Sequence, residues 1–464
     1  MTALVWFTRD LRLHDHPALC AAFDGHELVV PVFCLDDRLL GGRHASGPRT
    51  AFMLECLHDL DGVLRDRGSG LGVLHDAPER ALAELAARTG ATEVYCSADS
   101  GPYARARAGR VRAALEREGA RLREEPGLHA VDDLEQLRSA EGTPYRVFTP
   151  FHRRWLEEPR RPILPAPDRL PAPARLAQAP SLDALGLESS VADPMRGGER
   201  EARRRLERLL DGPVRAYADR NDVPGEDGTS RLSPYLHFGC VSAREVEERL
   251  PRGRGAAAFR RQLAWRDFYH QLLRHHPDSA RHELQPRYRG MRWSDDRELF
   301  AAWCDGRTGY PLVDAGMRQL RREGWMHNRV RLVVGSFLTK DLGIDWRWGE
   351  RWFMRWLVDG DQANNNGNWQ WIASVGADPQ PAYRRIYNPA RHQERFDADG
   401  VYVRRYVSEL REVPDAFLAE PWRMPADVQA ECGCVIGRDY PAPVVDHAEA
   451  RRAALARYEA PGAR

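Results

Sequence analysis

Residues 359–371 read DGDQANNNGNWQW. This segment holds two acids, three consecutive asparagines and two tryptophans within 13 residues, a composition that suits neither a helix nor a strand. Amides and carboxylates can hydrogen-bond the polar edge of a flat heterocycle, and indole rings can stack on it or donate electrons. A plain turn seldom carries so many side chains of this kind. The segment therefore predicts a functional site in an irregular stretch of chain.

Tryptophan is concentrated around this segment, because ten of the 13 tryptophans lie between Trp265 and Trp371. Such a cluster usually forms a large aromatic core, and it can also supply stacking platforms or a path for electrons. Trp348, Trp352 and Trp356 fall on one face of a helix that we expect to begin near Asp345.

Two more helices are predicted upstream. Residues 311–323 have a helical period that Gly324 ends, and a second period runs from Trp325 to Lys340. A lone histidine on such a helix, here His327, is usually structural.

Asn328, Arg329 and Arg331 lie in the same period, on an otherwise apolar helix. A buried arginine needs a carboxylate or phosphate partner. These three side chains are therefore candidates for a binding site.

Residues 261–273, RQLAWRDFYHQLL, predict another helix, which carries Gln262, Trp265 and Arg266. An indole beside an arginine and an amide could stack a base and hydrogen-bond its edge. The residues alone favour the commoner arrangement, a core face whose arginines extend to solvent.

The segment TSRLSP at 229–234 follows a loop containing glycine and aspartate. Ser233 before Pro234 predicts a helix start, with the hydroxyl as N-cap and the proline in the first turn. Small hydroxyls, free amides and Arg231 beside a helix N-terminus would also make an anion cradle. The segment alone supports simple capping and a phosphate site equally.

The N-terminal part alternates apolar runs, at 3–7, 28–35, 71–74 and 93–96, with helix-like stretches such as 49–66 and 78–89. This alternation predicts a parallel, Rossmann-like sheet in an α/β domain. No G-x-G-x-x-G motif follows the first run, so a dinucleotide site there is unsupported.

The pattern changes twice along the chain. It loses its α/β character near residue 126, and residues 159–180 are rich in proline and alanine, which is typical of an extended surface linker. From about residue 196 it is helical. We therefore predict an α/β domain over 1–126, an interdomain linker over 127–195 and an all-α domain over 196–464.

Composition excludes several classes of protein. The net charge is +1, so any nucleic-acid site must be a local patch rather than a basic coat. No apolar run approaches the ~20 residues of a membrane span, and the start MTALVWFTRD is no secretory signal. The eight cysteines are scattered, with only Cys432 and Cys434 close together, which predicts reduced cytosolic thiols and no metal site.

Taken together, these motifs resemble the cryptochrome/photolyase family, in particular its class I cyclobutane pyrimidine dimer photolyases. WFTRDLRLHDHPAL at 6–19 resembles the family's N-terminal signature. TSRLSP, WRDFY, TGYPLVDAGMRQL, GWMHNR, DGDQANNNGNWQW and RIYNP at 385–389 then appear in the family's order. The resemblance covers nearly the whole chain.

The resemblance implies an FAD held in a U-shape within the all-α domain. Arg266 would contact the flavin, Asp361 would bond the edge of the isoalloxazine, and Asn365 would face flavin N5. Arg331 and Asp359 would form an ion pair beside the ring. The residues that match contacts to the phosphates and ribityl chain are Tyr217, Thr229, Ser230, Arg231, Leu232 and Ser233.

The implied reaction is light-driven repair of cyclobutane pyrimidine dimers in UV-damaged DNA. Fully reduced, anionic FAD absorbs light and passes one electron to a dimer flipped out of the duplex, the ring opens, and the electron returns. Trp265 and Trp371 match the family's stacking residues, and Asn328 and Arg329 match contacts to the dimer or its phosphate. The residues that match the electron-hopping chain from the surface are Trp369, Trp346 and Trp293.

The chain departs from the family pattern at Gln262, where most class I dimer photolyases carry a glutamate. Together with Asn328 and Asn365, Gln262 is expected to take part in catalysis. The (6-4) photolyases also have glutamine there but require two histidines, and the matching positions here are Asn328 and Leu332. We therefore expect cyclobutane dimers as substrate. A smaller departure is His392, where the family usually has glutamine.

The alternative is a cryptochrome, which uses the same fold as a blue-light receptor with a protein partner. Asn365 favours a photolyase, because plant-type receptors tend to have aspartate there and animal-type receptors cysteine. The chain also ends soon after the helical domain, without a long signalling tail. We expect a cytoplasmic monomer that needs no protein partner and no membrane.

A second, light-harvesting chromophore is expected near His44, Arg49 and the loop ADSGPY at 98–103. Folate-type members usually have a glutamate in that loop, where this chain has Gly101. A deazaflavin is therefore favoured over a folate.

Overall fold

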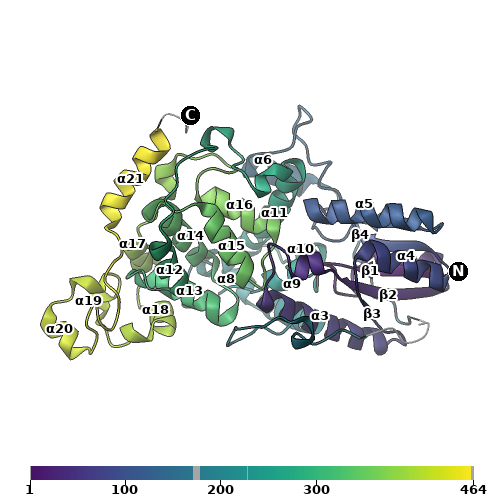
Figure 1. Ribbon diagram of the computed structural model, residues 1–464, viewed down its shortest axis with the longest axis horizontal. Helices are drawn as coiled ribbons and strands as arrows, with labels where there is room; N and C mark the ends of the chain where they lie inside the picture. The colour runs from purple at the N-terminus through teal and green to yellow at the C-terminus, as the bar shows by residue number, and fades with distance from the viewer. Residues whose placement is uncertain (1, 171–177, 227, 461–464) are drawn as a thin grey trace.

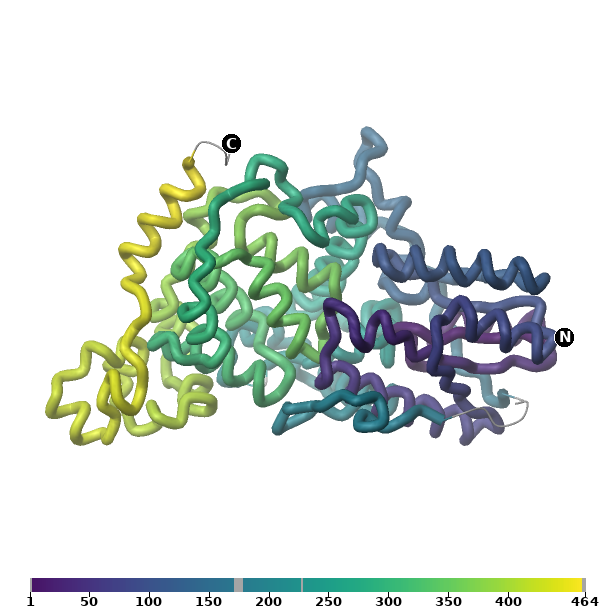
Figure 2. The backbone as a smooth tube through the Cα atoms, in the orientation of Figure 1, coloured from purple at the N-terminus to yellow at the C-terminus, as the bar shows by residue number. Residues whose placement is uncertain are grey.

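The computed structural model describes residues 2–170, 178–226 and 228–460. Figure 1 shows an α/β part, formed by the N-terminal residues, beside a larger helical part. In Figure 2 the chain can be followed from the purple strands to the C-terminal helix α21 (His447–Glu459), at the opposite end of the molecule. This arrangement confirms the predicted fold class.

In the part of the chain that the structure describes, the sheet contains five parallel strands in the order β3-β2-β1-β4-β5. They are β1 (Thr2–Phe7), β2 (Leu28–Leu35), β3 (Gly72–His75), β4 (Ala91–Ser97) and β5 (Arg121–Glu125). The first four coincide with the predicted apolar runs. The fifth was not predicted, because it is a largely exposed edge strand with the sequence RLREE.

Side chains alternate along β1, so the two faces of the sheet have different cores. Leu4 and Trp6 pack with α4 (Pro78–Thr89) and α5 (Pro102–Arg117). Val5 and Phe7 belong to a larger core that includes α1 (Pro17–Gly25) and α3 (Gly47–Arg65). The short helix α2 (Asp37–Leu40) follows β2.

The larger core continues into the helical part. The ring of Phe52 on α3 has its centroid 5.3 Å from that of Tyr235 and 5.6 Å from that of Phe238. The Leu11 amide donates a hydrogen bond to the Phe238 carbonyl at 3.0 Å. Because the two parts share one core, the sheet has a fixed position relative to the helices.

A further core holds the tryptophan-rich helices together and buries Trp303, Trp346 and Trp369. The helices of this part are α7 (Glu199–Leu210), α8 (Pro213–Arg220), α9 (Ser233–His237), α10 (Ala243–Arg249), α11 (Arg254–His275), α12 (Arg297–Asp305), α13 (Pro311–Glu323), α14 (Asn328–Ser336), α15 (Trp346–Trp356), α16 (Gln362–Ile372), α17 (Pro389–Phe396), α18 (Val401–Tyr406), α19 (Asp415–Leu418) and α20 (Ala426–Glu431). The predicted helices over 261–273 and 311–323 and the one beginning near Asp345 are confirmed.

The prediction of an irregular stretch at 359–371 is wrong, because residues 362–372 form helix α16. Asp361 caps this helix by accepting a hydrogen bond from the Asn364 amide at 2.8 Å. Gln370 donates to the Ser279 carbonyl at 2.7 Å, and Asn365 donates to the Glu350 carbonyl at 3.0 Å. Tertiary bonds of this kind use the amides that would otherwise compete with the helix backbone.

Two predicted helix starts are also wrong. Ser233 is the first residue of α9 rather than its cap, and its hydroxyl donates to Asp359 at 2.6 Å. Helix α14 begins at Asn328 instead of Trp325, because the His327 side chain accepts the Arg329 amide at 3.2 Å and caps the helix. A π-helical turn (Phe337–Asp341) follows α14.

The predicted linker over 127–195 includes a packed helix, α6 (Phe148–Glu157), which buries Phe148, Phe151 and Trp155. Part of its proline-rich stretch, residues 171–177, lies outside the described residues. The boundaries at residues 126 and 195 stay predictions. In the described ranges, no helix is both long enough and apolar enough to cross a membrane.

Candidate active site

A cavity of about 560 Å³ opens in the helical part between α8, α9, α11, α14 and α16. It collects the residues predicted to hold the phosphates, the ribityl chain and the lesion. Those that line it are Tyr217, Thr229, Ser230, Arg231, Leu232, Ser233, Gln262, Trp265, Arg266, Asn328, Arg329, Arg331, Asp359, Asp361 and Trp371. Asn365 and Trp369 line an adjoining cavity of about 80 Å³.

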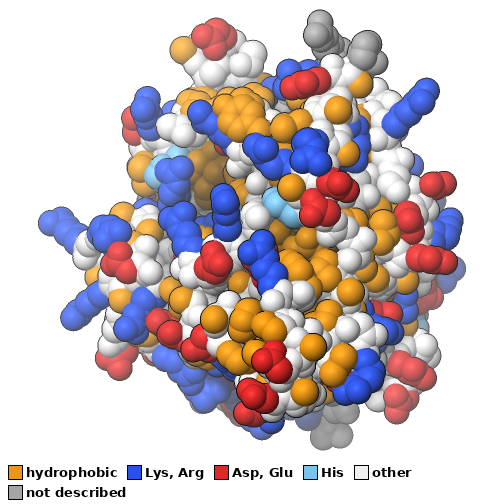
Figure 3. Space-filling view, turned by 90° about the vertical axis from the view of Figure 1, so that its left-hand side faces the viewer, with side chains coloured by type: hydrophobic (Ala, Val, Ile, Leu, Met, Phe, Trp, Pro, Cys, Tyr) orange, Lys and Arg blue, Asp and Glu red, His pale blue; other side chains and the backbone are white. Residues whose placement is uncertain are grey.

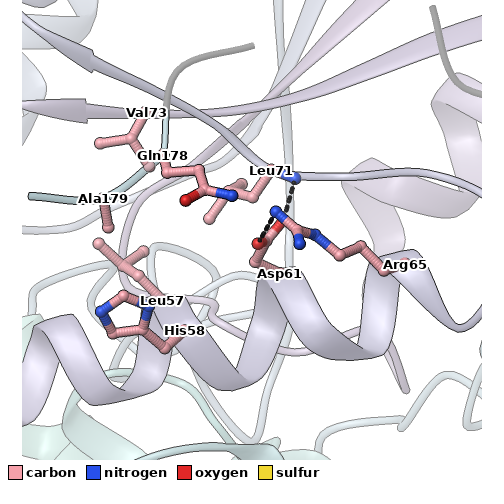
Figure 4. Close-up of a pocket in the computed structure, with 8 residues that line it drawn as sticks. All are labelled: Leu57, His58, Asp61, Arg65, Leu71, Val73, Gln178 and Ala179. Atoms are coloured by element: carbon pink, nitrogen blue, oxygen red, sulfur yellow. Dashed lines mark hydrogen bonds and ion pairs between the residues drawn. The ribbon is translucent and has the colours of Figure 1, made fainter. Parts of the chain in front are cut away.

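A separate cavity of about 170 Å³ lies between α3 and β3 (Figure 4). In it, Asp61 accepts the Leu71 amide at 2.9 Å and pairs with Arg65 at 2.8 Å. Ligand pockets for cofactors typically measure ~300–1,000 Å³. We assign no ligand to this smaller cavity.

Residues 229–233 form one end of the large cavity. Arg231 has a φ of +49°, and its guanidinium donates to Glu323 at 2.9 Å while lying 4.5 Å from the ring centre of Trp325. Helix α9 has only five residues, so its dipole is short. The hydroxyls of Thr229 and Ser230 and the nearby arginine are therefore the main polar groups of this end.

Asp359 lies at the middle of the cavity wall. Its Oδ2 accepts hydrogen bonds from Ser233 at 2.6 Å and from Arg331 at 2.8 Å, which is the ion pair that the resemblance implied. Its Oδ1 is buried and has no hydrogen-bond partner within the described part of the chain. A buried carboxylate oxygen without a partner indicates that the cavity is shaped for a polar ligand.

Asp361 is held by side chains from both parts of the molecule. Arg9 donates to its Oδ2 at 2.6 Å, and the His270 Nε2 lies 3.3 Å from its Oδ1. Burial alone would raise the pKa of Asp361, but His270, His237 and Arg9 outweigh it and hold this pKa well below its usual range. Asp361 is therefore a fixed negative charge on the cavity wall.

Asn365 lies beside a buried acid. Its Nδ2 donates to the backbone carbonyl of Glu350, whose side chain is buried with Arg43 as a distant partner, 3.7 Å away. Burial raises the pKa of Glu350 to about 7, against the opposing effects of Arg43, Arg351 and Asn365.

The part of the wall formed by α11, α14 and α16 carries aromatic side chains. Trp265 stacks on Phe148, with ring centroids 3.7 Å apart and the planes inclined by 3°. The guanidinium of Arg385 lies 3.8 Å from the ring centre of Trp371. Gln262 and Asn328 are exposed in this part of the wall.

Arg329 of the same part of the wall is paired with Asp222, 2.5 Å away, and its guanidinium lies 4.6 Å from the ring centre of Phe396. A phosphate that bound Arg329 would therefore have to compete with the Asp222 carboxylate.

The three tryptophans of the predicted electron path belong to one core. Trp369 and Trp346 are buried, and Trp293 is partly buried against the same cluster. The ring contacts of Trp369 are to Phe353, at 5.0 Å, and Trp303, at 6.2 Å.

Sequence reasoning missed several residues that line the cavity or contact its wall. His237 had a weak signal, because it lies four residues after Ser233 on the same helix. Arg9 and His270 had none, since their contacts to Asp361 depend on tertiary structure. Other missed lining residues are Asn221, Asp222, Phe259, Tyr269, Trp325, Asn364 and Asn368.

Comparison with known proteins places this cavity in a family. Residues 259–460 match the family described as "FAD binding domain of DNA photolyase", and residues 3–174 match "DNA photolyase". A relative from Streptomyces griseus named deoxyribodipyrimidine photo-lyase is 44% identical, over 97% of each chain. The chain belongs to the DNA photolyase family. The photo-lyase of Escherichia coli is 35% identical, over 99% of this chain and 98% of its own.

Solved photolyases and a cryptochrome have the same fold. A bacterial class III photolyase from Agrobacterium tumefaciens superposes with a TM-score of 0.92 at 35% identity, covering 98% of this chain and 97% of the other. An archaeal photolyase from Sulfolobus tokodaii with two FAD molecules gives 0.85 at 32% identity, covering 99% and 100%. A cryptochrome from Synechocystis gives 0.88 at 29% identity, covering 97% and 98%.

The cavity of this photolyase-family chain fits the cofactor of the matched domain. The hydroxyls at one end suit phosphates and the unpartnered oxygen of Asp359 suits a polar donor. The size lies within the range of cofactor sites. No group of His, Cys, Asp or Glu among the described residues could hold a metal ion.

Proposed function

We propose that this chain repairs cyclobutane pyrimidine dimers in DNA by light-driven electron transfer from FAD bound in the large cavity. The observation that carries the proposal is a single cavity that is lined both by the hydroxyls and charges of residues 229–233, Asp359 and Asp361 and by the indoles of Trp265 and Trp371. The names of the curated relatives, deoxyribodipyrimidine photo-lyases, support the same activity.

FAD, when bound, supplies the light-absorbing electron donor, in its reduced, anionic form. In the proposal, Tyr217 and residues 229–233 would hold its phosphates and ribityl chain, and Arg266 would add a further flavin contact. The charges of Asp361 and of the Arg331–Asp359 pair orient the isoalloxazine, and Asn365 faces its N5.

In the aromatic part of the wall, Trp265 and Trp371 would stack on a dimer flipped out of the duplex. Flipping costs a few kcal/mol, and less for a damaged pair than for intact bases. Gln262 and Asn328 would hydrogen-bond the dimer, and Arg329 would bind its phosphate after leaving Asp222. Figure 3 shows acidic and basic side chains interspersed on the face that it presents, with several basic ones beside an apolar hollow. A local DNA patch is expected on a surface of this kind.

A (6-4) photolyase is the less favoured activity. The positions that would need histidines are Asn328 and Leu332, which both line the cavity. The neighbouring His327 is buried, and its Nδ1 is engaged in capping α14. Burial lowers the pKa of His327 to about 4, so it stays neutral at physiological pH.

We further propose that Trp369, Trp346 and Trp293 carry electrons from the surface to oxidised flavin.

For the light-harvesting site we propose a deazaflavin near His44 and the loop 98–103. Arg49 has a structural role in this region, because its guanidinium already donates hydrogen bonds to the backbone carbonyls of Met354 and Leu357, at 2.6 and 3.2 Å. The S. tokodaii photolyase, with two FAD molecules, makes a flavin-like second chromophore a reasonable alternative outcome.

The proposed protein acts in the cytoplasm as a monomer on UV-damaged DNA, without an obligate protein partner. Its eight cysteines are all free, which suits a reducing compartment. Light scattering of the purified chain tests the oligomeric state.

The decisive experiment is to purify the full chain, record its absorption spectrum, reduce it chemically and illuminate it with thymine-dimer DNA. We expect a flavin spectrum and light-dependent loss of dimers. Trp265→Ala should weaken binding of dimer DNA by roughly 10- to 100-fold, the cost of one base-stacking contact. Trp348→Phe, in the same helical part but outside the cavity, is the matched control. A flavin-loaded protein that leaves dimers intact would refute the activity.

A further inference from the structure

The sheet has a crevice between β1 and β4, at the position where open α/β sheets usually bind a ligand. In the order β3-β2-β1-β4-β5, the chain connections leave β1 and β4 in opposite directions. Open α/β sheets bind their ligands between the carboxyl ends of such strands. Arg9 follows β1 here and Asp99 follows β4. Figure 1 shows these strand ends facing the helical part.

The crevice is occupied by a carboxylate from the helical part. Arg9 donates to both oxygens of Asp99, at 3.0 and 3.0 Å, through Nε and Nη2. Its remaining Nη1 donates to Asp361 at 2.6 Å, across 352 residues of sequence. Asp361 caps α16 and lines the large cavity. A single guanidinium therefore joins the sheet edge to the cavity wall.

A second arm reaches the other oxygen of Asp361. Ser100, which also follows β4, is 2.8 Å from the Nδ1 of His270. The Nε2 of His270 is 3.3 Å from Asp361 Oδ1. The ring of His129 lies against that of His270, with centroids 4.8 Å apart. Arg9, which follows β1, thus bonds to one oxygen of the carboxylate, while His270, which contacts Ser100 after β4, lies close to the other oxygen, to which the Asn364 amide also donates.

This arrangement is more than an interface contact, because Asp361 is also a wall residue. A carboxylate buried to this depth without a cation would take up a proton or turn away. The charged and titratable groups that face it are Arg9, Arg49, Asp99, His129, His237, Arg266 and His270.

We propose that Arg9 and His270 are positioning residues, through which the α/β part keeps Asp361 charged and oriented for the flavin. The inference rests on the proposed function, because it requires FAD in the large cavity. It makes the α/β part a component of the flavin site, in addition to any light-harvesting role.

The test is FAD affinity as a function of pH, measured by quenching of flavin fluorescence with full-length apoprotein. The parent should bind with an affinity that changes less than about threefold between about pH 5.5 and pH 8.5. In Arg9→Gln the carboxylate loses the guanidinium that is hydrogen-bonded to its Oδ2, so its pKa should rise and it should take up a proton as pH falls. Affinity should then drop by about tenfold per pH unit below the new pKa.

Two variants separate positioning from general stabilisation of the interface. Asp99→Asn removes the other partner of Arg9 but leaves the bond to Asp361, so its affinity should stay flat with pH. Arg9→Lys keeps the charge and should restore most of the parental affinity. Circular dichroism checks folding, and His270→Leu, which removes the imidazole beside the other oxygen, decides the matter if Arg9→Gln does not fold.

The outcomes are distinguishable. The positioning role would be overturned if Arg9→Gln, or His270→Leu in its place, bound FAD as tightly as the parent at every pH. The proposed function would then stay intact. A pH-dependent loss in Asp99→Asn equal to that in Arg9→Gln would also overturn it, since the effect would then belong to the interface. A folded parent that takes up no FAD would overturn the proposed function itself.

Discussion

Replacement of Glu350 by glutamine should make the protein more stable at neutral and alkaline pH. Glu350 lies on α15 with only 1% of its surface exposed, and its Oε2 has no hydrogen-bond partner among the described residues. Burial raises its pKa from an ordinary 4.5 to about 7. The folded state therefore prefers the protonated acid, and ionising it costs free energy.

The sign and the size of this change in stability follow from the linkage between protonation and folding. When the pKa of a carboxyl group is higher in the folded state, its stabilising contribution to the free energy of unfolding is complete at a pH below the unfolded pKa. This contribution is lost as pH rises from the unfolded to the folded pKa. Between pH 4.5 and about 7 the loss amounts to about 3 kcal/mol, at 1.36 kcal/mol per pH unit. Glutamine has nearly the same shape and does not titrate, so Glu350→Gln removes this loss.

The assay is urea unfolding followed by tryptophan fluorescence from about pH 5 to pH 8. The free energy of unfolding of Glu350→Gln, relative to the parent, should rise by about 2.5 kcal/mol over this pH range and level off above pH 7. Glu394→Gln, an exposed glutamate on α17, is the matched control and should show no such rise. A difference that is constant with pH, or that falls, would refute the reasoning.

Four further predictions concern the site. Arg329→Ala should weaken binding to damaged DNA and reduce its salt dependence by about one released counterion, and unchanged affinity at several salt concentrations would count against the contact. Trp369→Phe should slow photoreduction of bound flavin but spare repair after chemical reduction, which flash photolysis and a repair assay measure separately. Gly367→Ala should destabilise the protein by about 1–3 kcal/mol in urea unfolding, because a Cβ there would lie 2.1 Å from the Tyr269 ring. Gln262→Glu should raise the repair yield per photon, since a carboxyl group can share a proton with the dimer carbonyls and an amide cannot. An equal yield would contradict that role.

The fold could be predicted where burial leaves a strong pattern. Strands such as 28–35 are covered on both faces, so they are nearly continuous apolar runs in the sequence. The edge strand β5 has one covered side and few apolar residues, so nothing in its sequence distinguished it from a loop. The helix over 362–372 was missed for a different reason. Its asparagines are poor helix formers, and only contacts with α11 and α15 make the helix favourable.

The site could be predicted where its residues are close in sequence or carry a family motif. Arg331 and Asp359 form the ion pair that the resemblance implied, and Ser233 donates a hydrogen bond to the same carboxylate. Arg9 could not be assigned in this way. It belongs to an N-terminal motif, but its partner Asp361 is 352 residues away, and no local pattern links two such positions.

The net charge of the chain is near zero, and opposite charges are also paired in the cavity wall. Among the described residues, each aspartate that lines the cavity has an arginine partner: Asp222 with Arg329, Asp359 with Arg331, and Asp361 with Arg9. Removing one member of a buried ion pair costs about 3–5 kcal/mol, because the other charge is left unpaired. The wall therefore holds its charges in place before any ligand arrives, so an incoming polar cofactor meets oriented dipoles and needs little rearrangement of the protein. This pairing also explains why charged side chains can line a cavity between two hydrophobic cores.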